Sequence, residues 1–151
     1  MEIRVIERNE MNKALDLVLI TFMEFEAPDF SQEGIDTFKS SVFENEQFLK
    51  NAVFYGAFEG NDICGVAATR KHGSHLALLF VDGRRHRQGI GKKLFEHVLE
   101  SCNADELTVN SSPYAVEVYH RMGFTDTAPE QILDGIRYTP MIYSKIKTNK
   151  K

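Results

Sequence analysis

Positive charge gathers on one short segment of an otherwise acidic chain. Between Arg84 and Lys93 the sequence reads Arg-Arg-His-Arg-Gln-Gly-Ile-Gly-Lys-Lys, which holds five of the eighteen Lys and Arg residues of a chain with net charge −4. This segment follows the apolar run Leu76–Val81 and precedes an amphipathic helix. Its two glycines let the backbone approach a ligand, and the first helical turn offers unpaired N–H groups at the positive end of the helix dipole. Consecutive N–H groups of this kind form a concave nest, so the segment predicts an anion site.

Spacing excludes two familiar phosphate-binding loops. A Walker loop has Gly, four residues, and then Gly-Lys-Ser/Thr. Here His86 stands at the position of its first glycine and Lys93 at the position of its hydroxyl residue. A dinucleotide-binding Gly-x-Gly-x-x-Gly that begins at Gly89 needs a third glycine at Leu94. The anion site is therefore of another kind.

A second motif lies further along the chain, where a predicted strand ends at Asn110 and Tyr119-His120-Arg121-Met122-Gly123-Phe124 follows. Together with the glycine loop, in this order and with a helix and a strand between them, it resembles the GNAT superfamily of N-acetyltransferases. The family's loop pattern is Arg/Gln-x-x-Gly-x-Gly/Ala, and its later signature is Asn, a short helix and Tyr-x-x-x-Gly-Phe. The first loop position is His86 here, a departure that weakens one side-chain contact to phosphate. The resemblance covers residues 52–124.

The resemblance implies that the anion is the pyrophosphate of acetyl-CoA, a co-substrate. The residues that it assigns to the pyrophosphate are Arg87, Gln88, Gly89, Ile90, Gly91 and Lys92. In the family the sheet splays between its fourth and fifth strands, and the pantetheine arm pairs there with the exposed backbone of Leu79, Phe80 and Val81. Such pairing suits the two amides of pantetheine, because an open strand edge has matching donors and acceptors. Asn110 is expected to hydrogen-bond pantetheine, and a helix cap is its alternative role.

Attack of an amine on a thioester needs a neutral amine, a donor for the developing oxyanion and a proton for the departing thiolate. A backbone N–H near Phe80 is the expected oxyanion donor, since the splay frees amides of the fourth strand. Tyr119 of the Tyr-x-x-x-Gly-Phe motif is the candidate general acid. Its reference pKa of about 10 exceeds the value of about 8.5 for a thiol, so the phenol stays protonated at neutral pH. The alternative for Tyr119 is a core aromatic side chain on the helix face that it shares with Val116.

Several residues compete for the role of general base. His75 begins the fourth strand, and period-two alternation places it on the same face as Val81. Some family members use a histidine of this strand, and an imidazole with a pKa near 6.5 suits proton transfer. A strand-end histidine that faces solvent is the alternative. Glu24 and Glu26 lie where the family commonly binds the acceptor, so they are candidates for acceptor binding or for the base, with the solvated face of a helix end as the alternative. An amine can also lose its proton through water.

Apolar spacing predicts the elements that must position these residues. A helix capped by Asn9 runs to Phe25 with Pro28 just beyond, Ser31 caps a second helix, and Phe48–Asn51 leads into a strand. The predicted strands and helices that follow are residues 53–58, 63–70, 75–81, 90–103 (helix), 107–110, 113–122 (helix) and 138–146, with residues 3–5 as an edge strand. A loop is predicted before the last strand.

The resemblance implies the GNAT fold, an α+β fold. Its central mixed, mostly antiparallel sheet of six to seven strands splays between strands 4 and 5 and is flanked by about four helices. The chain is expected to form one such domain over residues 1–146. A polar tail follows at residues 147–151 and is expected to be disordered.

Composition bounds the class of protein and its partners. A chain of 151 residues that is 42% hydrophobic and 26% charged suits one globular domain. Its apolar runs fall short of the roughly 20 residues of a membrane span and it starts without an apolar signal region, so we expect no membrane partner and a cytoplasmic location. A pI near 5.7 and a compact basic segment argue against a nucleic-acid partner. The histidines lack metal spacing, and Cys64 and Cys102 are expected to be reduced structural cysteines, so no metal is expected.

These inferences converge on an acetyl-CoA-dependent N-acetyltransferase that acts on a primary amine by direct attack on the thioester. The alternative is a catalytically silent acyl-CoA-binding module, a sensor or regulator that keeps the loop without the chemistry. The acceptor stays open among aminoglycosides, polyamines, amino-acid amines and protein N-termini, so it is a small molecule or a peptide. Dimerisation is common in the family, and the final strand is a candidate contact for a homodimer.

Overall fold

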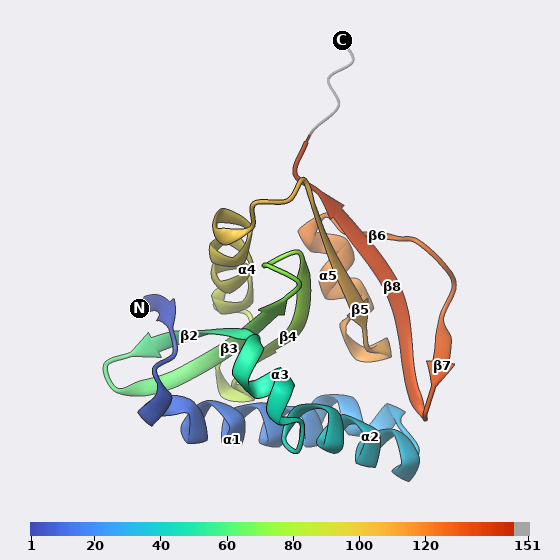
Figure 1. The fold of residues 1–151 in the computed structure, drawn as a ribbon, viewed down its shortest axis with the longest axis horizontal. Helices are drawn as coiled ribbons and strands as arrows, with labels where there is room; N and C mark the ends of the chain where they lie inside the picture. Colours follow the sequence, from blue (N-terminus) through green and yellow to red (C-terminus); the bar gives the residue numbers. More distant parts are fainter. Residues whose placement is uncertain (147–151) are drawn as a thin grey trace.

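A mixed sheet with helices on both faces forms the body of the molecule (Figure 1), a computed structural model that describes residues 1–146. Within that range the eight strands follow the order β1-β2-β3-β4-β5-β8-β6, and β7 pairs with β8. The strands are β1 (Glu2–Val5), β2 (Val53–Glu59), β3 (Asp62–Arg70), β4 (His75–Val81), β5 (Glu106–Ser111), β6 (Thr125–Asp126), β7 (Gln131–Leu133) and β8 (Ile136–Ser144). The α-helices are α1 (Met11–Thr21), α2 (Gln32–Val42), α3 (Glu46–Asn51), α4 (Ile90–Ser101) and α5 (Val116–Met122). The predicted tail, residues 147–151, lies outside the described residues.

β4 and β5 are joined at one end and separate toward the other. They run parallel, and their pairing is confined to His75 with Thr108 and Leu76 with Val109. β4 then continues to Val81 without a partner among the described strands on that side. The predicted mixed, mostly antiparallel sheet that splays between its fourth and fifth strands is confirmed. Residues 1–146 contain eight strands and five α-helices, more than the six to seven strands and about four helices predicted.

Two apolar cores, one on each face of the sheet, hold the layers together. α4 packs one face through Leu94, Phe95 and Val98, with α5 beside it. α1 packs the other face through Val18, and the chain beyond it adds Phe22. The helices therefore flank the splay from both sides, as Figure 1 shows for α4 and for α1 with α2.

A β-bulge at Ala77 changes the direction in which the residues of β4 face. Consecutive residues of β3 pair with Leu78 and Leu76, which leaves Ala77 as an extra residue. Leu76 and Val81 both pack in the core on the α4 side. Strict alternation would place them on opposite faces, because their positions differ by an odd number. His75, the neighbour of Leu76, therefore faces the α1 side. The prediction that His75 and Val81 share a face is wrong, because period-two alternation does not count a bulged residue.

The beginnings of the first two helices differ in how well the sequence predicts them. A 3-10 turn precedes α1, and Glu7 rather than Asn9 stands at its cap position. The Glu7 amide donates to the Glu10 carboxylate at 2.9 Å, as in a capping box. Ser31 caps α2 as predicted, since its hydroxyl accepts from the Gly34 amide at 3.3 Å.

A π-helical segment, Phe22–Glu26, extends α1 toward the splay. The Ala27 amide donates to the carbonyl of Phe22, five residues back. Pro28 has no amide hydrogen to offer the carbonyl of Glu24, so a regular α-helix cannot continue here. The wider turn takes in one extra residue and thereby re-aims the side chains at the end of the segment.

α3 and β7 lie where the sequence analysis predicts other structure. Asn45 caps α3 by accepting from the Phe48 amide at 3.1 Å, so the segment predicted to lead into β2 is helical. β7 and β8 form a hairpin where a loop is predicted. Its turn residues Asp134 and Gly135 have φ angles of 51° and 82°, and Asp-Gly is a strong signal for such a type I′ turn.

The β7–β8 hairpin is docked on the first turns of α2. A Cβ added to Gly34 would lie 2.2 Å from the carbonyl oxygen of Gly135, so the two backbones touch with no room for a side chain. The Thr37 hydroxyl donates to the carbonyl of Asp134 at 2.6 Å. Arg137 donates through Nη1 to the carbonyl of Asp29 at 3.1 Å. These contacts tie the outer arm of the sheet to the helix layer.

We expect Gly34→Ala to lower the free energy of unfolding by about 1 to 3 kcal/mol, because the added methyl overlaps backbone that cannot move aside alone. Gly91→Ala is the matched control within a helix. Its methyl would meet Val81 and Met122 at 3.7 and 3.8 Å, which is ordinary contact. Urea unfolding measures both variants, and equal stabilities would contradict the docking of the hairpin on α2.

Candidate active site

The basic segment forms a turn that leads into α4, and the first amides of that helix have no partner within it. Gly89 stands at the N-cap of α4 with φ +79°, a conformation that favours glycine. The first helical bond runs from the Lys93 amide to the Gly89 carbonyl at 3.0 Å. The amides of Ile90, Gly91 and Lys92 therefore have no partner within the helix. This is the geometry of an anion nest at a helix N-terminus.

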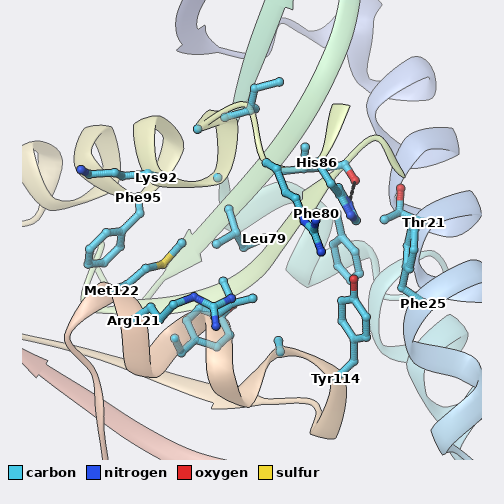
Figure 2. Close-up of a pocket in the computed structure, with 18 of the residues that line it drawn as sticks. Thr21, Phe25, Leu79, Phe80, His86, Lys92, Phe95, Tyr114, Arg121 and Met122 are labelled. Atoms are coloured by element: carbon cyan, nitrogen blue, oxygen red, sulfur yellow. Dashed lines mark hydrogen bonds between the residues drawn. The ribbon is translucent and has the colours of Figure 1, made fainter. Parts of the chain in front are cut away.

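His86 anchors this turn to the end of β4. Its Nε2 lies 2.9 Å from the carbonyl oxygen of Val81, drawn as a dashed line in Figure 2. The imidazole centroid lies 4.7 Å from that of the Phe25 ring. Arg84 is also held locally, through Nη2 to the Asp82 carboxylate at 2.8 Å. The histidine that departs from the family's loop pattern thus has a structural contact of its own.

A cavity of about 900 Å³ opens beside the turn, between β4, α4 and α5. Eight of the ten predicted cofactor-binding residues line it: Leu79, Phe80, Val81, Arg87, Gly89, Ile90, Gly91 and Lys92. Figure 2 shows Lys92 from α4 and Arg121 from α5 at one side of this cavity, and Phe25 and Tyr114 at the other. Gln88 is exposed and lies outside the lining.

The edge of β4 presents free backbone groups to the splay. The Asp82 amide donates to the backbone carbonyl of Cys64 in β3 at 2.9 Å. Because the backbone groups of a strand alternate in direction, those of Phe80 also face β3, and those of Leu79 and Val81 face the splay. His86 occupies the carbonyl of Val81. The open groups next to Phe80 are therefore the amides of Leu79 and Val81 and the carbonyl of Leu79.

A second cavity, of about 380 Å³, lies at the other side of the splay. The residues that line both cavities are Glu26, Leu79, Phe80, Ala115 and Tyr119. The two cavities therefore meet at one carboxylate, one phenol and the free edge of β4. A ligand in each cavity would bring its end to this junction.

Tyr119 is buried at the junction. Its ring meets Phe124 edge to face, with centroids 5.3 Å apart. Burial, and then the charge of Glu26, raise the pKa of the Tyr119 phenol above its usual range. The phenol is therefore a proton donor throughout the physiological pH range.

Glu26 carries the second titratable group at the junction. Burial is the largest influence and raises the pKa of its carboxyl to about 7, the Ser112 hydroxyl acts in the opposite direction, and Asp29 adds to the rise. A carboxyl group that titrates near neutrality can both take up and release a proton there. The π-helical segment aims this side chain at the splay, whereas the neighbouring Glu24 is exposed and lines neither cavity.

His75 and Asn110 lie on the side of the second cavity. His75 is buried at the closed end of the splay, where its Nδ1 lies 2.8 Å from the Thr108 hydroxyl. Burial lowers the pKa of His75 to about 4, and the charges of Arg70 and Lys71 act in the same direction. Asn110 lines the second cavity and not the first. The Ser112 hydroxyl caps the 3-10 turn Pro113–Ala115 that leads into α5, because it accepts from the Ala115 amide at 3.3 Å. The alternative role of Asn110 as the cap is therefore wrong.

Comparison with known proteins agrees with this architecture. Residues 26–145 match the model of the acetyltransferase (GNAT) domain. The chain belongs to the GNAT acetyltransferase family. A search of the curated proteins gave no match for this GNAT chain.

Solved structures share the GNAT fold over almost the whole chain. They include a GCN5-related N-acetyltransferase from Rhodopseudomonas palustris, with 19% identity, a TM-score of 0.81 and 95% and 94% of the two chains covered. The PaiA N-acetyltransferase from Thermoplasma acidophilum, in complex with coenzyme A, has 16% identity, a TM-score of 0.72 and 95% and 99% coverage. An aminoglycoside 6'-N-acetyltransferase from Enterococcus faecium has 14% identity, a TM-score of 0.66 and 99% and 100% coverage. At these identities the likeness shows the fold alone.

Several residues that line the first cavity of this GNAT domain escape the sequence analysis. Arg121 lies within the quoted Tyr-x-x-x-Gly-Phe motif, and its charge two residues after Tyr119 is the signal that could have found it. Phe25 lies before the glycine loop and Tyr114 lies between the two motifs, and no local pattern joins them. Across the described part of the chain there is no group of three or more His, Cys, Asp or Glu residues that could hold a metal. Nor does any helix of residues 1–146 have the length and apolar character needed to cross a membrane.

Proposed function

We propose that the protein transfers an acetyl group from acetyl-CoA to a primary amine. The observation that carries this proposal is the meeting of two cavities at Glu26 and Tyr119 beside the free edge of β4. A donor in the larger cavity and an acceptor in the smaller one would react at that junction. A module that only senses acyl-CoA needs the first cavity and has no use for the second.

The larger cavity suits the charge and length of acetyl-CoA. The three free amides at the start of α4, with Lys92 and Arg121, supply donors and positive charge for a pyrophosphate. The open groups of Leu79 and Val81 suit the amides of pantetheine. When bound, acetyl-CoA supplies the activated acyl group, and the structure of the PaiA N-acetyltransferase with coenzyme A supports a CoA ligand in this fold.

Two groups of the chain would assist the departure of the thiolate. The free amides at positions 79 and 81 would donate to the thioester oxygen as negative charge develops on it. Tyr119 would donate its proton, or a hydrogen bond, to the sulfur. Its raised pKa keeps the phenol protonated, and its burial keeps water from competing for that proton.

Glu26 is the group that best suits removal of a proton from the amine. It lies at the junction and titrates near pH 7, which matches a general base at neutral pH. His75 is the other candidate. It lies at the closed end of the splay, and a pKa of about 4 leaves it a weak base. We therefore assign the base to Glu26 and give His75 a place in the wall of the acceptor cavity.

The pH dependence of Glu26→Gln tests this assignment. Because the carboxylate form is the base and the pKa of Glu26 is about 7, the ratio of wild-type to variant kcat/KM should rise about tenfold per pH unit below 7 and level off above it. At pH 8 the variant should be about 100-fold slower or worse. The ratio cancels the ionisation of the amine itself. CoA release with a panel of primary amines measures the rates.

Glu24→Gln is the matched control, since Glu24 is exposed and lines neither cavity.

The thermal stability of Glu26→Gln gives a readout that does not need the acceptor. Because the pKa of the Glu26 carboxyl is raised in the folded state, its ionisation lowers the free energy of unfolding as pH rises from 4.5 through 7, by at most about 3 kcal/mol. Glu26→Gln should therefore raise Tm at pH 8 by several degrees and hardly at pH 4. A pH-independent activity ratio would refute the role of Glu26 as the base.

A further inference from the structure

The acceptor cavity has an aromatic wall that is fixed in place. Phe30, Phe38 and Phe48 line it from α2, α3 and the segment before them. The Phe38 ring stacks on the buried Phe22 ring, with centroids 3.8 Å apart and planes within 2°. Phe38 also meets Phe80 edge to face at 6.1 Å. A wall of this kind suits an apolar body and gives no partner to a ligand that is polar all round.

Positive charge lies at the end of this cavity that is far from Glu26. Arg70 of β3 lines it and stands directly opposite His75 of β4 in the strand register. No carboxylate within residues 1–146 pairs with Arg70. Arg137 also lines the cavity, but its guanidinium is paired with Glu130 at 3.0 Å. Arg70 is thus the cation of this cavity that has no such partner among the described residues.

Two carboxylates of the described part of the chain line the cavity, and neither forms an ion pair with Arg70. Glu26 is at the junction with the first cavity, and Asp134 is in the turn of the β7–β8 hairpin. Two carboxylates against an open guanidinium make a poor site for a polycation, since the repulsion from Arg70 has no local neutralisation. At about 380 Å³ the cavity is also at the small end of ligand sites.

The spacing of the two ends along β4 indicates the approximate length of the ligand. Arg70 is level with His75, and the junction begins at Leu79 on the same strand. Four residues of strand span about 13 Å, and the bulge between them shortens this to roughly 10 Å. A reacting amine at Glu26 and a group held by Arg70 are therefore at opposite ends of one extended molecule.

We propose that the acceptor is a primary amine on an apolar body that carries an anionic group at its far end, bound by Arg70. This inference rests on the proposed function, because it takes the second cavity as the acceptor site. It separates the candidates that the sequence leaves open. Polyamines and aminoglycosides have no anionic group and several positive charges, so they fit this cavity poorly.

Matched amine pairs test the proposal by CoA release. The pairs are octylamine with ω-aminooctanoate, and phenylethylamine with its para-carboxylate; spermidine and kanamycin represent polycations. We expect the carboxylate member of at least one pair to have a kcat/KM about tenfold higher than its partner, the effect of one charge-assisted hydrogen bond. Arg70→Gln should remove that advantage through KM, so that the two members of the pair react with similar kcat/KM.

Lys71→Asn is the matched control, since Lys71 is the adjacent exposed cation and does not line the cavity. It should keep the preference that Arg70→Gln loses. Equal rates within both pairs, a preference for the polycations, or a preference that survives Arg70→Gln would each overturn the proposal while leaving acetyl transfer intact. If no amine releases CoA, the proposed function fails instead. Calorimetric titration of ω-aminooctanoate and octylamine then judges the cavity alone, and equal affinities would overturn the anionic end.

Discussion

We expect Gly89→Glu to abolish CoA binding. The substitution places a side chain on a residue with φ +79°, a conformation that costs a residue with a Cβ about 1 to 2 kcal/mol. It also brings a carboxylate to the amides of Ile90, Gly91 and Lys92, where the pyrophosphate would lie. Loss of two charge-assisted hydrogen bonds alone weakens binding by about 3 kcal/mol, or roughly 100-fold. Calorimetric titration with CoA measures the change.

Gly60→Glu is the matched control for this experiment. Gly60 also has a positive φ, +60°, and a Cβ there would meet nothing within 4 Å, as at Gly89. Both variants should therefore lose similar stability, and only Gly89→Glu should lose CoA. Wild-type CoA affinity in Gly89→Glu would refute the assignment of the turn as the pyrophosphate site.

Tyr119→Phe should lower kcat about 100- to 10,000-fold while CoA affinity stays close to that of the wild type. The substitution removes the buried proton donor and keeps the ring that packs on Phe124. Tyr55→Phe makes the same change at another buried tyrosine, whose ring faces His97 and lines neither cavity. That variant should keep full activity.

The two measurements on Tyr119→Phe separate an enzyme from a binder. CoA release in the presence of an amine reports turnover, and titration with CoA reports the first cavity alone. A wild type that binds CoA and releases none with any amine is the outcome expected of a regulatory module. A Tyr119→Phe variant as fast as the wild type would remove the phenol from the mechanism.

The first cavity could be predicted from the sequence because its chemistry is local. A glycine at the N-cap, free amides and nearby cations are consecutive residues, so a short motif identifies them. The pairing of pantetheine with the edge of β4 depends on the splay, and the resemblance to the family predicts that splay. Eight of ten predicted cofactor residues therefore line one cavity. Asn110 does not, because the stretch of β5 that holds it and its neighbour Val109 lines the second cavity.

The second cavity could not be predicted because no segment contains it. Its wall comes from α2, α3, β3, β4, β5, β7 and β8, and each side chain has an ordinary local pattern. The raised pKa of Glu26 depends on burial by elements far away in the sequence. Glu24 and Glu26 are the same residue type in the same short segment, so the sequence gives no reason to prefer either. The π-helical turn exposes Glu24 and places Glu26 at the junction of the cavities. The face of His75 depends on a bulge that periodicity cannot reveal.

Under the proposed function, the extra residue in β4 would divide one strand between the two substrates of the reaction. On the loop side of Ala77, the free backbone groups of Leu79 and Val81 would hold the acetyl donor, whatever side chains those positions carry. On the other side, His75 and its neighbours line the cavity proposed for the amine. Substitutions of the side chains that line the acceptor cavity would then leave intact the main chain proposed to hold the thioester. A scaffold with this division could change its acceptor specificity and keep the same acyl donor.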